Sequence, residues 1–72
     1  MICYKPFWNT LSKSNESTYS LIKHHNISGS TIQKLRENKP LNTTTLNDLC
    51  RILKCTIQDI AEYIPSDDDQ KL

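Results

Sequence analysis

The chain contains few of the residues that interrupt regular structure: its 72 residues include one glycine and three prolines. Because glycine and proline usually mark turns and break helices, their scarcity favours helices joined by short turns. The prolines stand at positions 6, 40 and 65, between the segments with helical spacing or at their ends. The sequence also lacks an apolar run near the roughly 20 residues of a membrane span. Its length and its 36% hydrophobic content are those of a single soluble domain with a small core.

Cysteine is present in a pattern that supports neither disulfides nor a metal site. The three cysteines, at positions 3, 50 and 55, are odd in number, and no two form a Cys-x-x-Cys pair of the kind that anchors zinc. The N-terminal sequence MICYKPFW has no apolar stretch of the length that a secretory signal requires, which predicts a cytoplasmic protein with reduced thiols. We therefore interpret the cysteines as packing residues and expect no metal and no cofactor.

Sequence motifs of catalysis are missing as well. The chain contains no GxSxG, no phosphate-binding loop and no HExxH. The adjacent His24 and His25 raise the question of a metal, but neighbouring residues of a helix point in different directions and cannot bind one ion from a single face. A cationic imidazole at a helix C-terminus is stabilised by the helix dipole. We expect one of the two histidines to pack and the other to be exposed, and we predict that the protein is not an enzyme.

The charge of the chain is divided between its two halves. Residues 1–40 carry six basic and two acidic side chains, a balance of +4, whereas residues 41–72 carry three basic and six acidic ones, a balance of −3. An anionic partner is therefore attracted to the first half, although an ordinary solvated surface can carry the same number of basic groups.

Helical spacing of apolar residues predicts two helices in the first 25 residues. In residues 5–14 this spacing is formed by Tyr4, Phe7, Trp8 and Leu11. In residues 18–25 the helix follows Ser17, a favoured N-cap, and ends at Asn26, which tolerates the left-handed conformation of a helix stop.

A third helix is predicted to begin sharply in the stretch SGSTIQKLR, after a short turn at residues 26–28. Ser28 is the candidate N-cap, and Ile27 and Ile32 have the spacing of a hydrophobic staple. Only Ile32 and Leu35 form the inner stripe of this helix. A helix this polar needs neighbours to hold it and presents most of its surface outward.

Two further helices are predicted in the second half. One follows Asn42 and ends near residues 54–55; its apolar positions are Leu46, Leu49, Cys50, Ile52 and Leu53. The other opens with the capping-box pattern TIQD at residues 56–59 and stops at Pro65. The prediction is an all-α bundle of five short helices over residues 1–65, followed by an acidic, mobile tail over residues 66–72.

The stretches YSLIKHHNISGSTIQKLRENKP and TLNDLCRILKCTIQDIAEYIP resemble the phage repressor and Cro (Cro/C1) family of helix-turn-helix regulators, over residues 4 to about 65. The closing segment is especially similar to very small, single-domain bacterial regulators. Three positions depart from the family pattern. Asn26 replaces the turn glycine, Gly29 stands where relatives often direct a side chain to a base, and Thr18 replaces a glutamine that binds phosphate.

The resemblance implies a lambda-repressor-like domain whose third helix enters the major groove of double-stranded DNA while the second crosses the backbone. The expected base contacts are Ser28, Ser30, Thr31 and Lys34. The expected phosphate contacts are Thr18, Lys23, Arg36, Lys39, Thr43 and Thr44. The alternative for the basic side chains is an ordinary solvated surface, and for the two threonines at positions 43 and 44 it is simple helix capping.

The function implied by the resemblance is transcription regulation, by a repressor that occupies its operator. A weak homodimer through the C-terminal helix is expected, because one reading helix covers too few base pairs for useful specificity. No membrane partner is expected. A protein-interaction module, such as the antitoxin of a toxin–antitoxin pair, is the alternative; in it the acidic tail is the active element.

Overall fold

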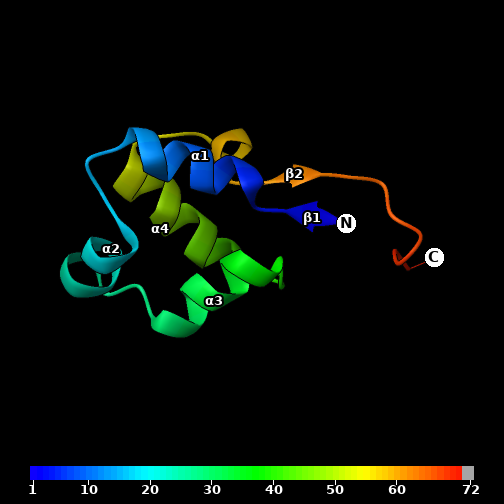
Figure 1. Cartoon of the computed structure of the whole chain (residues 1–72), viewed down its shortest axis with the longest axis horizontal. Helices are drawn as coiled ribbons and strands as arrows, with labels where there is room; N and C mark the ends of the chain where they lie inside the picture. Colours follow the sequence, from blue (N-terminus) through cyan, green and yellow to red (C-terminus); the bar gives the residue numbers. More distant parts are fainter. Residues whose placement is uncertain (71–72) are drawn as a thin grey trace.

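The computed structural model describes residues 1–70, and its helices surround α4 at the centre of the molecule (Figure 1). The described residues form α1 (Lys5–Lys13), α2 (Thr18–His25), α3 (Gly29–Glu37), α4 (Thr43–Leu53) and the single 3-10 turn η1 (Ile57–Asp59). Two short strands, β1 (Ile2–Cys3) and β2 (Glu62–Tyr63), pair antiparallel, with Ile2 opposite Tyr63. The strand pair lies at the end of the molecule opposite α2.

The first four predicted helices are confirmed, including most of their boundaries. Ser17 and Ser20 form a capping box at the start of α2, in which the Ser20 N–H donates to the Ser17 hydroxyl over 3.1 Å and the Ser17 N–H donates to the Ser20 hydroxyl over 2.8 Å. Asn42 precedes α4 as predicted, but its side chain makes no cap hydrogen bond.

The fold is mostly helical as predicted, but the predicted fifth helix is wrong and a small strand pair was not predicted. Thr56 and Asp59 do form the predicted capping box, yet the helix ends after one 3-10 turn and the chain continues as β2. Of its apolar residues only Ile60 is fully buried, whereas Ile57 and Ile64 are 48% and 45% exposed. A helix of two turns before a proline is marginal by itself, and residues 62–63 find backbone partners in β1 instead.

The core is formed by one face of every α-helix together with Ile60, the residue after η1. Its fully buried side chains are Phe7, Leu21, Leu35, Leu49 and Ile60. The N–H of Phe7 donates to the carbonyl of Ile60 over 3.2 Å, which ties the segment after η1 to α1. Ile27 and Ile32 are both buried, consistent with the predicted staple at the start of α3. Within residues 1–70, the helices are too short and too polar to cross a membrane.

The acidic segment after β2 folds back toward the start of the chain. A carboxylate oxygen of Asp69 lies 2.8 Å from the α-ammonium of Met1, and Asp69 accepts a 2.7 Å hydrogen bond from the hydroxyl of Tyr63. These contacts, the ammonium first, hold the pKa of Asp69 below its usual value. The predicted tail runs to residue 72, and its last two positions lie outside the described residues.

Candidate nucleic-acid interface

A tight turn of three residues joins α2 to α3. Asn26 adopts the left-handed conformation with φ 59°, and the following N–H of Ile27 donates to the carbonyl of Leu21 over 3.0 Å, which closes the end of α2. Ile27 is buried, so the turn is anchored in the core. Ser28 then caps α3, because its hydroxyl oxygen accepts the N–H of Thr31 over 3.1 Å. The sequence prediction of a helix-turn-helix at residues 18–37 is therefore confirmed.

Three hydroxyl groups gather at the N-terminus of α3. The oxygen of Ser28 lies 2.9 Å from the hydroxyl of Ser30 and 2.9 Å from that of Thr31. Ser28 and Ser30 are exposed and Thr31 is half-buried. Since the Ser28 oxygen already accepts a backbone N–H, this residue orients the cluster, and Ser30 is the hydroxyl that faces outward.

The outward face of α3 continues with Gln33, Lys34 and Glu37, which are all exposed, opposite the buried Ile32 and Leu35. The side-chain amide of Gln33 donates to a carboxylate oxygen of Glu37 over 2.8 Å. The sequence analysis assigned neither residue to the interface. Gln33 and Glu37 are four positions apart, and Gln33 is three positions after Ser30. Residues with this spacing share one face of a helix, so the sequence could have placed both on the same face as Ser30.

The remaining predicted contact residues surround this helix. Within residues 1–70 the ion pairs are Met1–Asp69, His25–Glu16 and Arg51–Asp48, so the exposed Lys34, Arg36 and Lys39 have no acidic partner there. The same is true of Lys23 on α2. The guanidinium of Arg36 stacks 5.7 Å from the centroid of the Trp8 ring.

Threonines occupy the starts of two other helices. Thr18 is the first residue of α2 and is half-buried, whereas Thr43 and Thr44 begin α4 and are exposed. Because the side chain of Asn42 leaves the first N–H groups of α4 uncapped, these groups can donate to a phosphate.

This geometry is that of a known DNA-binding family. The sequence profile of the Cro/C1-type helix-turn-helix DNA-binding domain matches residues 7–66. The chain belongs to this family. The crystal structure of the transcriptional regulator VanUg superposes with a TM-score of 0.80 at 29% sequence identity, covering 90% of this chain and 87% of that one. A search of curated proteins finds no match.

The family assignment places DNA binding on the Cro/C1-type domain described above. Within residues 1–70, no three histidine, cysteine, aspartate or glutamate side chains are grouped to hold a metal ion. His24 is exposed, whereas His25 is half-buried against Glu16, as expected for two adjacent residues at the end of α2.

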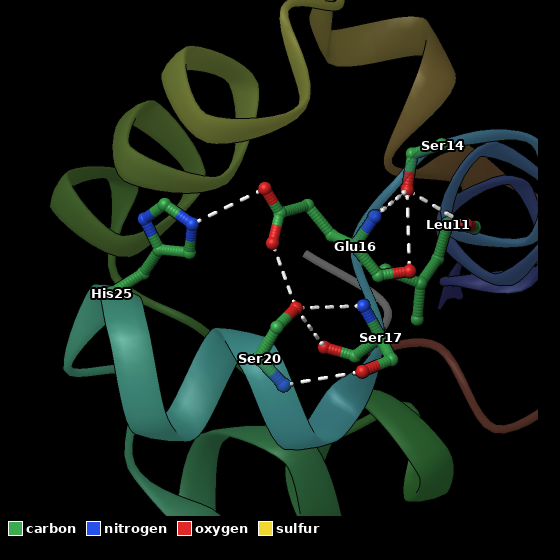
Figure 2. A network of polar contacts seen from close by, with 6 residues as sticks. All are labelled: Leu11, Ser14, Glu16, Ser17, Ser20 and His25. Carbon is green, nitrogen blue, oxygen red and sulfur yellow. Dashed lines mark hydrogen bonds and ion pairs between the residues drawn. The ribbon is translucent and has the colours of Figure 1, made fainter.

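A polar network holds the N-terminus of α2 in this Cro/C1-type domain (Figure 2). The carboxylate of Glu16 accepts a 2.7 Å hydrogen bond from the hydroxyl of Ser20 and lies 3.3 Å from Nε2 of His25. The Ser20 hydroxyl, followed by His25, keeps the pKa of Glu16 below 4.5. The network therefore links both ends of α2 to the segment that precedes it, and so fixes the helix that crosses the DNA backbone in this family.

Glu16→Gln is expected to reduce the loss of folding stability that occurs as the pH is lowered. The pKa of Glu16 is lower in the folded state than its ordinary value of 4.5. The stability that this carboxylate contributes is therefore present above that pH and is lost as the pH falls through the folded-state pKa. Thermal melts from about pH 6 to about pH 3 will show a smaller loss of stability in the variant than in the wild type. Glu62→Gln serves as the matched control on β2. An acid-side slope identical to wild type in Glu16→Gln would contradict this role.

Proposed function

We propose that this protein is a sequence-specific transcriptional regulator, and that it represses by occupying its operator. The observation that carries the proposal is the outward face of α3, which is polar, exposed and centred on a lysine without an acidic partner within residues 1–70. A major groove about 12 Å wide admits such a helix. Membership of the Cro/C1-type DNA-binding family and the likeness to the regulator VanUg support it.

The proposed contacts divide into base readout and backbone positioning. Lys34 donates to guanine O6 or N7, and the hydroxyls of Ser30 and Thr31, oriented by Ser28, bind neighbouring base edges. These short side chains give modest discrimination, so the lysine carries most of the base preference. The phosphate contacts are Thr18, Lys23, Arg36, Lys39, Thr43 and Thr44.

Selection of bound duplexes from a random DNA pool tests the proposal. We expect enrichment of one short motif, and binding to that motif that weakens steeply as salt rises. A promoter carrying the selected site upstream of a reporter should lose output when the protein is expressed. Recovery of sequences without an enriched motif would contradict sequence-specific binding. A rise in reporter output would indicate that the protein activates transcription rather than represses it.

The proposed partner, besides DNA, is a second copy of the chain. The dimer surface cannot be the predicted C-terminal helix, because residues 57–63 contain η1 and β2 instead. An apolar end takes its place, which we define as the exposed side chains Met1, Ile2, Ile57, Tyr63 and Ile64. It borders a shallow cavity of about 510 Å³ whose walls also include residues 38–41, directly after α3. The surface is therefore close to the C-terminal end of the reading helix.

Ile64→Ser is expected to weaken self-association, because it removes an exposed apolar side chain from the apolar end. Ultracentrifugation of the free protein and of its complex with a selected palindromic site measures the effect. Wild type should place two protomers on the site, with weaker self-association when DNA is absent. The matched control is Ile22→Ser, which removes an exposed isoleucine from α2. One wild-type protomer per site at saturation would overturn the dimer and leave DNA binding intact.

A further inference from the structure

The first turn of α1 and the residue before it contact the last turn of α3 and the loop that follows it. The indole Nε1 of Trp8 donates to the carbonyl of Leu35 over 3.4 Å, and its ring lies under the guanidinium of Arg36. The phenol of Tyr4 donates to the carbonyl of Lys39 over 2.7 Å. Two aromatic residues four positions apart thus reach a segment of five residues that carries two of the proposed phosphate contacts.

The ring of Trp8 is held in place by packing against the core. It packs edge-on against Phe7, with centroids 4.9 Å apart and an interplanar angle of 78°, and Phe7 is fully buried. Arg36 therefore rests on a surface whose orientation is fixed. An arginine side chain has many rotamers, so stacking it in advance lowers the entropy lost when it binds a phosphate.

Tyr4 holds the main chain at Lys39 in place by hydrogen bonding. Its side chain is 3% exposed, and its own N–H donates to the side-chain oxygen of Asn38 over 2.9 Å. Asn38 is the left-handed cap of α3, with φ 56°. Hydrogen bonds to two successive residues therefore hold the point where the chain leaves α3, although Lys39 itself is exposed.

We infer that Trp8 and Tyr4 are positioning residues for DNA binding: Trp8 orders Arg36, and Tyr4 orders Lys39, so that both cations meet the backbone of one DNA site. This inference rests on the proposed function. The sequence indicated only that these two aromatic residues have helical spacing with Phe7 and Leu11.

A double-mutant cycle between Trp8→Phe and Arg36→Ala tests the first pair. Phenylalanine keeps a ring but lacks the indole N–H and gives a weaker cation–π surface. Trp8→Phe alone should weaken DNA binding roughly two- to fivefold, which is the affinity equivalent of an exposed cation–π contact. In the Arg36→Ala background it should have no further effect on affinity. The matched control pairs Trp8→Phe with Arg51→Ala, an exposed arginine of α4, and there the two effects should add.

A merely structural role of Trp8 gives a different result. It lowers the melting temperature and changes affinity equally with or without Arg36, and that outcome would overturn the inference. All affinities are therefore measured at a temperature where circular dichroism shows every variant folded. Tyr4→Phe, crossed with Lys39→Ala in the same way, keeps the second pair testable if Trp8→Phe does not fold. If the wild-type protein binds no duplex in the pool, the proposed function is wrong, and this inference fails with it.

Trp8 also provides a direct optical signal, because it is the only tryptophan of the chain. If Arg36 turns toward a phosphate while it remains near the indole, Trp8 emission will change on addition of the selected duplex. Arg36→Ala should still bind at higher protein concentration but without this change. An equal emission change in wild type and Arg36→Ala would count against the pairing of Trp8 with Arg36.

Discussion

Leu49→Ala is expected to lower the free energy of unfolding by about 2–5 kcal/mol. Leu49 is fully buried in α4, among core residues contributed by the other helices and by Ile60. Removing its side chain loses the transfer free energy of the buried methyl groups and leaves a cavity that the neighbours fill only in part. A domain this small has a total stability near the low end of about 5–15 kcal/mol, so the variant will be partly unfolded at physiological temperature.

Urea denaturation followed by circular dichroism measures this change, and Asn47→Ala is its matched control. Asn47 lies two residues earlier on the same helix and is exposed, so the control changes helix propensity without opening a cavity. Its midpoint should stay close to that of wild type. A Leu49→Ala midpoint equal to the control would mean that α4 does not form the centre of the core.

Lys34→Ala is expected to cost roughly 1–3 kcal/mol of DNA-binding free energy at one base pair and to relax the preference there. The physical reason is that a lysine on the outward face of α3 loses its hydrogen bonds to a guanine edge only where that guanine is present. Binding to sequences that already carry another base at this position should change little. Affinities for a panel of duplexes substituted one base pair at a time provide the measurement.

Lys39→Ala is the matched control, because it removes the same side chain from the loop after α3. A lysine that contacts a phosphate contributes equally to every sequence, so its loss should weaken the whole panel uniformly and reduce the salt slope by about one. Equal, sequence-blind effects from both substitutions would overturn the assignment of Lys34 to a base and leave DNA binding in place.

The parts of the fold that the sequence predicted are those specified by neighbouring residues. The N-cap at Ser17, the cap at Ser28 and the left-handed stop at Asn26 all act within one turn of chain, and each lies where it was predicted. The helix-turn-helix followed from these signals because they mark the start and end of α2 and the start of α3.

The fifth helix was mispredicted because its competitor lies far away in sequence. The periodicity of residues 57–64 and the capping box at Thr56 favour a helix, but neither indicates that residues 2–3 offer backbone partners to residues 62–63. The stacking of Arg36 on Trp8 could not be predicted for the same reason, since it depends on how α1 crosses α3. Local patterns predicted which residues could face DNA, whereas the contacts that order them arise from tertiary packing.

The pairing of β1 with β2 has a consequence for the order of folding. The Met1 ammonium and the Ile64 carbonyl that meet there are 63 positions apart in sequence, so this contact closes a loop of nearly the entire chain. The entropy of that closure is lost before the two-residue strands contribute their few hydrogen bonds. Contacts of low sequence separation form faster. We therefore expect the helix-turn-helix to assemble first and the strand pair to form last.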